Sequence, residues 1–129
     1  GQPWKTQALV DSVLHSQYFN NPNGLSGNED CGQMSAWYVL NAMGFYQLCP
    51  GNPEYSIGRP LFDAITIRLP QGKEFKIVVQ NNSAENKYIE SAVLNRTVLS
   101  KPYFTHQQLM EGGTLQVVMT NQPTKWGTE

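Results

Sequence analysis

The sequence predicts an α+β chain, with two N-terminal helices followed by an antiparallel β segment or β-sandwich. Apolar residues recur at helical spacing up to about residue 45, and from Tyr55 onward apolar and polar residues alternate. The turn-forming run Pro50-Gly51-Asn52-Pro53 separates these two patterns. We therefore divide the chain of 129 residues, 40% of them hydrophobic, into segments 1–50 and 51–129.

The first predicted helix begins near Pro3, which suits a first helical turn, and ends before the Asn20-Asn21-Pro22-Asn23-Gly24 run. Its apolar residues form one stripe: Trp4, Ala8, Val10, Val13, Leu14 and Tyr18. We expect an amphipathic helix that is partly exposed.

The second predicted helix, from about Gln33 to Phe45, is apolar on almost every side. This texture is typical of a helix enclosed by other elements, and a small domain cannot cover it all round. We therefore expect an exposed face that permits self-association.

The remaining elements are short. Five candidate strands cover Tyr55–Ile57, Ile65–Leu69, Phe75–Val79, Tyr88–Leu94 and Leu115–Thr120. Thr105 followed by Gln108 predicts a capped short helix that closes at Gly112-Gly113.

Nine basic and ten acidic residues give a net charge of -1, which provides no electrostatic footprint for nucleic acid or an anionic membrane. No apolar run approaches the roughly 20 residues needed to cross a bilayer. We expect neither partner.

Cys31 and Cys49 stand at opposite ends of the second helix, about 20 Å apart by helical rise, so we expect free thiols. Cys31 has no histidine nearby in sequence, and the adjacent carboxylate disfavours a thiolate, so it is a poor candidate nucleophile.

The stretch GLSGNEDCGQMSAWYV, Gly24 to Val39, places Asn28, Glu29 and Asp30 in a glycine-flanked loop before the second helix. Asp30 and Gln33 form a capping-box pattern, which alone explains Asp30 as a helix cap. The clustered oxygens beside it equally suit acid–base chemistry or a bound cation.

Four stretches resemble glycoside hydrolase family 92, the bacterial calcium-dependent α-mannosidases: Gly24 to Asp63, GQPWKTQ at Gly1 to Gln7, NNSAENKYIESAVLN at Asn81 to Asn95, and THQQLMEGGTLQVVM at Thr105 to Met119. The resemblance implies an N-terminal β-sandwich, an (α/α)6 barrel and terminal strands. Segment 1–50 would be the last barrel helices and 51–129 the β segment that packs on them, with the rest of the parent enzyme as partner.

By the same resemblance, Asp30 is the catalytic base of an inverting mannosidase, with Asn28 and Glu29 as its neighbours in the catalytic loop. Asp30 and Asn28 would be calcium ligands, and the remaining ligands and the general-acid glutamate would precede this chain. The resemblance implies a parent enzyme that removes terminal α-1,2-linked mannose from glycans, in the periplasm, at the cell surface or secreted by a bacterium. The chain alone would be inactive.

Two further points stay open. Gln2 and Trp4 are candidate substrate-binding residues, although an aromatic residue on an apolar helical stripe ordinarily packs. The β segment could instead be a carbohydrate-binding module, if Tyr55, Phe75, Tyr88 and Tyr103 lie exposed on one sheet face, or a purely structural cap of the barrel.

Overall fold

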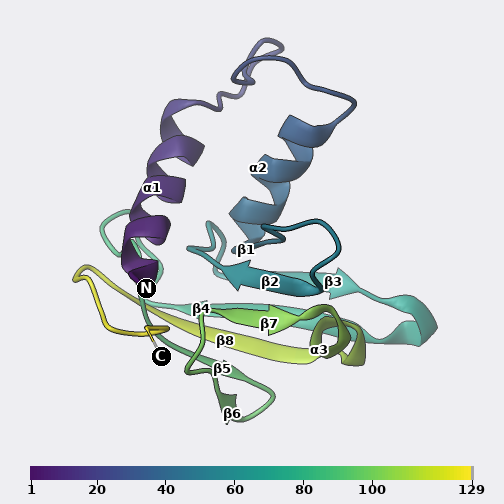
Figure 1. Cartoon of the computed structure of the whole chain (residues 1–129), viewed down its shortest axis with the longest axis vertical. Coiled ribbons are helices and arrows are strands. Elements are labelled where there is room, and N and C mark those ends of the chain that lie inside the picture. Colours follow the sequence, from purple (N-terminus) through teal and green to yellow (C-terminus); the bar gives the residue numbers. More distant parts are fainter. Residues whose placement is uncertain (129) are drawn as a thin grey trace.

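The computed structural model describes residues 1–128, in which two helices stand on a pair of β-sheets (Figure 1). Helix α1 (Pro3–Ser16) leads away from the sheets, and a long loop connects it to α2 (Gln33–Met43), which returns toward them. The predicted α+β class is confirmed. None of the described helices is long and apolar enough to cross a membrane.

Helix α1 buries a largely polar face against the β segment. Gln7, Asp11 and Leu14 are its buried residues, and the Gln7 side-chain oxygen accepts a hydrogen bond of 3.0 Å from the Ile89 backbone N–H. Leu9, in contrast, is 67% exposed. The apolar stripe that the sequence predicts is therefore only partly covered within this chain.

Helix α2 ends two residues earlier than predicted. Gly44 has a left-handed φ of 94°, and its N–H donates to the Asn41 carbonyl at 2.9 Å. A β-carbon at Gly44 would lie 2.6 Å from the Pro60 ring, so glycine is required there for packing as well as for conformation. Phe45 consequently begins a strand.

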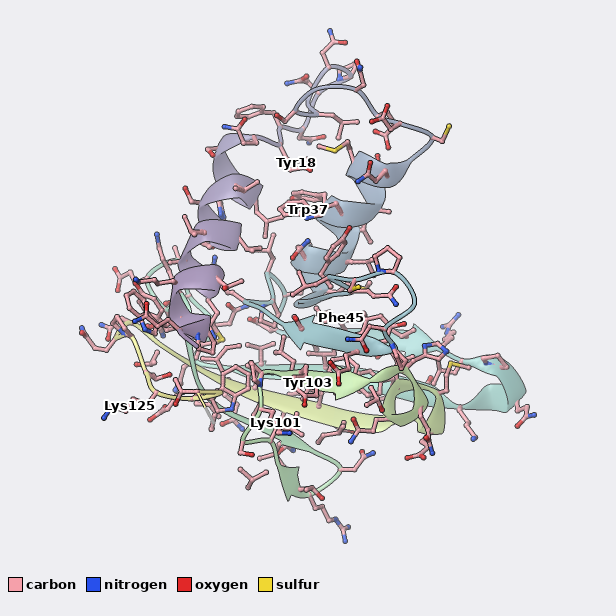
Figure 2. The ribbon with its side chains drawn as sticks, in the orientation of Figure 1. Tyr18, Trp37, Phe45, Lys101, Tyr103 and Lys125 are labelled. Carbon is pink, nitrogen blue, oxygen red and sulfur yellow. The ribbon has the colours of Figure 1, made fainter. Side chains whose placement is uncertain are left out.

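Aromatic rings connect α2 with the segment that follows α1 (Figure 2). Tyr18 stacks on Trp37, with ring centroids 5.4 Å apart and planes inclined by 11°, and also contacts Tyr38 at 5.0 Å. Val39 on α2 is 52% exposed. The predicted exposed face of α2 is confirmed.

The smaller sheet has the order β1-β2-β7 and is antiparallel throughout. It comprises β1 (Phe45–Tyr46), β2 (Glu54–Ile57) and β7 (Tyr103–Thr105). The prediction missed β1 and β7 because two or three residues are too few to show alternation. Since β1 precedes residue 50, the small sheet draws on both predicted segments, and the division at residue 50 stays a prediction.

The larger sheet has the order β3-β4-β8-β5-β6. It comprises β3 (Ala64–Arg68), β4 (Glu74–Gln80), β5 (Tyr88–Leu94), β6 (Thr97–Val98) and β8 (Gly113–Thr120). A 3₁₀ turn, η1 (Pro70–Gly72), joins β3 to β4. The prediction of antiparallel strands is wrong for one pair: β4 and β8 run parallel, because the long excursion between them brings the chain back in the same direction.

The short helix α3 (His106–Glu111) has the predicted capping box. The Thr105 hydroxyl accepts from the Gln108 N–H at 3.2 Å, and the Gln108 side-chain oxygen accepts from the Thr105 N–H at 2.8 Å. The helix closes at Gly112, where φ is 80° and a β-carbon would lie 2.8 Å from the Glu74 carbonyl oxygen.

The hydrophobic core lies between the two sheets. Phe45, Ile57 and Phe104 from the smaller sheet pack against side chains of the larger one, of which Phe75 and Val117 are fully buried. The core is completed by residues of the larger sheet and α3: Ile77, Val79, Ile89, Ala92, Leu94, Leu109, Leu115 and Met119. The β segment thus forms its own core and provides a rigid base for the helices.

Candidate functional site

The loop that carries Asn28, Glu29 and Asp30 lies at the end of the helix pair farthest from the sheets (Figure 1). Asp30, Cys31 and Gly32 have successive φ values of 49°, 59° and 93°, so the chain makes a left-handed turn before α2 begins. Each non-glycine residue in this region costs about 1 kcal/mol. Such strain is concentrated at functional sites.

Asp30 is not the helix cap that the sequence pattern suggested, and that interpretation is wrong. The N-cap of α2 is Gly32, which has no side-chain capping bond, and the Gln33 N–H reaches only the Asp30 backbone carbonyl, at 3.3 Å. Within the described chain the Asp30 carboxylate is exposed and has no hydrogen-bond partner.

Glu29 supplies the capping contact instead. One of its carboxylate oxygens accepts from the Ser35 backbone N–H at 3.1 Å, and the other accepts from the Ser35 hydroxyl at 3.0 Å. The Glu29 backbone carbonyl also accepts from the Met34 N–H at 3.3 Å. Glu29 is therefore bound to the first turn of α2 through both its side chain and its backbone.

Tyr18 lies beside this loop. The pKa of its phenol is raised above the ordinary value of 10.0, first by burial and then by the negative charges of Glu29 and of Tyr46. A cavity of about 390 Å³ opens next to it, lined by Tyr18, Phe19, Asn20, Gly24, Leu25, Ser35, Tyr38 and Val39. Tyr18, which follows α1, and Tyr38 of α2 thus line the wall of this cavity.

Asn28 and Asp30 are both exposed and have no side-chain partners among the described residues, so hard oxygen donors are available to a cation such as calcium. Both oxygens of Glu29 are engaged by Ser35. Residues 1–128 contain no group of three or more His, Cys, Asp or Glu side chains placed to hold a metal. The donor chemistry fits calcium, and this chain would supply only part of the six to eight ligands it takes.

The structure does not bring Gln2 and Trp4 to this loop. They lie at the opposite end of α1, whose 14 residues span about 20 Å. Gln2 lines a separate cavity of about 240 Å³ with Pro102, and Trp4 is half-buried with the Lys5 ammonium 5.4 Å from its ring. Their role in substrate binding stays a prediction.

The sequence analysis missed a buried ion pair. Asp11 and Arg59 are each more than nine-tenths buried, an Arg59 Nη donates to the Asp11 carboxylate, and its other Nη donates to the Ser83 carbonyl at 2.9 Å. Lys87 approaches the same carboxylate at 3.5 Å. Since 48 positions separate Asp11 from Arg59, no local sequence pattern predicts that they pair.

The aromatic residues proposed for a carbohydrate-binding module do not form an exposed platform. Phe75 is fully buried, and Tyr55 packs edge-on against Phe45 and also contacts Phe104. Tyr88 lies in the larger sheet and Tyr103 in the smaller one. The β segment is therefore better described as a structural unit.

Both cysteines are unpaired, as predicted, and both are exposed.

A sequence profile described as the Glycosyl hydrolase family 92 catalytic domain matches residues 1–121 of the chain. A protein of Arthroderma benhamiae described as an uncharacterized secreted glycosidase is 30% identical to the chain, over 99% of it and 17% of that protein.

Two solved structures from Bacteroides thetaiotaomicron have the same fold. A family GH92 inverting mannosidase is 46% identical with a TM-score of 0.92, covering 100% of this chain and 18% of that one. A family GH92 α-mannosidase in complex with mannoimidazole is 39% identical with a TM-score of 0.89, covering 95% and 16%.

The chain spans less than a fifth of the length of each of these relatives. The profile match nevertheless extends over nearly all of it, including the Asn28–Asp30 loop, both helices and the sheets. The chain therefore belongs to glycosyl hydrolase family 92, within the catalytic domain.

Proposed function

We propose that this chain is part of an exo-acting, inverting α-mannosidase that hydrolyses terminal α-1,2-linked mannose, with Asp30 as the general base. The observation that carries the proposal is the Asp30 carboxylate, exposed on a strained turn at a helix start and without a partner in the described chain. A structural aspartate would be expected to use its oxygens locally. The similarity of the chain to an inverting mannosidase supports this assignment of Asp30.

Inverting hydrolysis requires a carboxylate to take a proton from water and a carboxylic acid to protonate the leaving oxygen from the other side of the sugar. Asp30 is suited to the first role, because its lone pairs are not engaged within the chain. The acid is expected outside this chain. Glu54, Glu90 and Glu111 lie on β2, β5 and α3, at the sheet end of the molecule (Figure 1).

Calcium is part of the proposal, with Asp30 and Asn28 among its ligands and the other ligands supplied by the parent protein. When bound, calcium would polarise sugar hydroxyls and assist ring distortion. Glu29 is not among the proposed ligands, because each of its carboxylate oxygens already accepts a hydrogen bond from Ser35. Asn28 and Asp30 would hold and orient the groups around the sugar, and Asp30 would hold the proton taken from water.

The exposed apolar side chains of α1 and α2 support a larger assembly. Leu9 on α1, Val39 on α2 and Phe19 in the loop between them are all more than half exposed, whereas the sheets have an enclosed core. We propose that preceding parts of the parent protein cover these residues and complete the site. The chain alone would then be inactive. The secreted relative supports export of the parent protein.

The test is mannose release from α-1,2-mannobiose by the parent protein, with calcium and with a chelator, compared with Asp30→Asn and with this chain alone. We expect calcium-dependent hydrolysis by the parent, a loss of at least about 100-fold in kcat for Asp30→Asn, and no activity of the isolated chain. Glu85→Gln, an exposed loop carboxylate, is the control and should keep the parental rate.

An Asp30→Asn enzyme at full rate would remove Asp30 from the chemistry. Hydrolysis by the isolated chain would show that the acid lies within residues 1–129. Equal rates on α-1,2- and α-1,3-mannobiose would remove the linkage preference while leaving the mannosidase assignment.

A further inference from the structure

We propose that Ser35 and Glu29 are positioning residues, which together fix the carboxylate of Asp30 for the reaction. The inference rests on the proposed function of Asp30. Neither residue is assigned a contact with substrate. Their role is to hold the strained turn between them in one conformation.

The contact between the two residues is bidentate. The Ser35 backbone N–H and hydroxyl bind separate oxygens of the Glu29 carboxylate, at 3.1 and 3.0 Å. Hydrogen bonds to an ionised carboxylate are about twice as strong as neutral ones. Because Ser35 is in the first turn of α2, its N–H also presents the positive end of the helix to Glu29.

This contact encloses the turn that carries Asp30. Asp30, Cys31 and Gly32 occupy the left-handed region one after another, and two of them have β-carbons that disfavour it. The backbone bonds that cross the turn are long, 3.3 Å from the Gln33 N–H to Asp30 and 3.3 Å from the Met34 N–H to Glu29. The Glu29 side chain adds two bonds, at 3.1 and 3.0 Å, which join the residue before the turn to the first turn of α2.

The geometry also explains why Glu29 and Asp30, although adjacent and both acidic, have different surroundings. Glu29 is half-buried with both oxygens bound, and Asp30 is exposed with neither bound in the described chain. The first residue is used to build the site, and the second is available for chemistry.

The test uses the intact parent protein carrying Ser35→Ala, Ser35→Thr, Glu29→Gln or Glu29→Ala, with Ser12→Ala as a control at an exposed serine on α1. We expect Ser35→Ala and Glu29→Ala to lower kcat by about 10- to 100-fold, because a displacement of about 1 Å is enough for such a loss. KM should change by no more than about twofold, since ground-state binding is unaffected. Ser35→Thr keeps the hydroxyl and should restore at least half the parental kcat, and Ser12→Ala should match the parent.

A double variant separates positioning from a general loss of folding. If Ser35 acts through Asp30, adding Ser35→Ala to Asp30→Asn should lower the residual kcat by less than about twofold, because the residues act as one unit. Circular dichroism and Tm identify any variant that fails to fold; Ser35→Thr and Glu29→Gln, which keep most of the contact, then decide the outcome.

Parental kcat in both Ser35→Ala and Glu29→Ala would overturn the positioning role. So would a full additional loss in the double variant. Both results are distinguishable from failure of the proposed function, which shows as full activity of the Asp30→Asn single variant.

Discussion

Tyr18 connects the loop to the helix pair through its ring and through its ionisation. The phenol lies near Glu29, and its pKa is raised by burial and by that carboxylate, so the folded chain keeps the phenolic proton to higher pH than the unfolded chain. Its contribution to stability is fully present below the ordinary pKa of 10.0 and is lost as pH rises through the folded value.

This difference predicts a pH effect. The Tm of the wild-type chain should fall more steeply above pH 10.0 than that of Tyr18→Phe, which lacks the titrating group. Glu29→Gln should lower the pKa of Tyr18 toward the ordinary value, as followed by the ultraviolet absorbance of tyrosinate with Tyr18→Phe as the blank. An unchanged titration in Glu29→Gln would show that the carboxylate does not act on the phenol.

The buried pair of Asp11 and Arg59 gives a second prediction. Asp11→Ala leaves a buried guanidinium with only the Ser83 carbonyl as partner, and removal of one member of such a pair costs about 3 to 5 kcal/mol. Urea unfolding of the isolated chain measures the loss. The control is Ser12→Ala, since Ser12 is exposed on the same helix and its loss should change stability by less than about 0.5 kcal/mol.

The short helix α3 depends on its cap, because six residues are too few to be stable alone. Thr105→Ala removes the hydroxyl that accepts from the Gln108 N–H and should cost about 1 kcal/mol of unfolding free energy. Thr105→Ser keeps the oxygen and should remain within a few tenths of the wild type. Equal losses in the two variants would assign the effect to the methyl group instead of the cap.

The elements that sequence predicts well have their signal in neighbouring residues. Pro3, the Thr105–Gln108 box and the alternation through Phe75–Val79 each specify local structure and appear as expected. Strand direction depends on which distant strand pairs, so the parallel pairing of β4 with β8 was beyond local pattern.

At the candidate site, too, the sequence predicted the local features and missed the contacts between separated residues. The glycines around Asn28–Asp30 correctly predict an irregular loop, but a capping box requires a helix that starts immediately after Asp30, and the left-handed turn delays that start by two residues. The capping function consequently falls to Glu29, six positions from Ser35. No standard motif has that spacing, so Ser35 was missed.

Across the whole molecule, polar contacts hold α1 to the β segment, and part of the apolar surface of this helix is left uncovered. Gln7 and Asp11 are buried, and Leu9 is 67% exposed. A surface helix of a complete domain normally turns its apolar residues toward the core. An exposed leucine such as Leu9 is expected on a helix that packs against a further element on that side.

The exposed position of Leu9 predicts that one substitution has different effects in the isolated chain and in the parent protein. Leu9→Asp should leave the Tm of the isolated chain within about 2 °C and reduce any self-association seen by sedimentation, because it replaces an exposed apolar group. In the parent protein the same substitution would bury a charge and should cost at least about 2 kcal/mol. Ser12→Asp, at an exposed position on the same helix, should be tolerated in the isolated chain. A parent protein that tolerates Leu9→Asp would show that this face stays uncovered.

The position of β8 has a consequence for biosynthesis. β8 follows every other strand of the larger sheet in the sequence, yet it lies in the middle of that sheet, between β4 and β5. Until Gly113–Thr120 has been translated, those two strands have no shared partner and leave edges that can pair with other chains. The loop with Asp30 is therefore translated before the strand that joins the two halves of its supporting sheet, and that sheet can be assembled only after Gly113–Thr120 has been made.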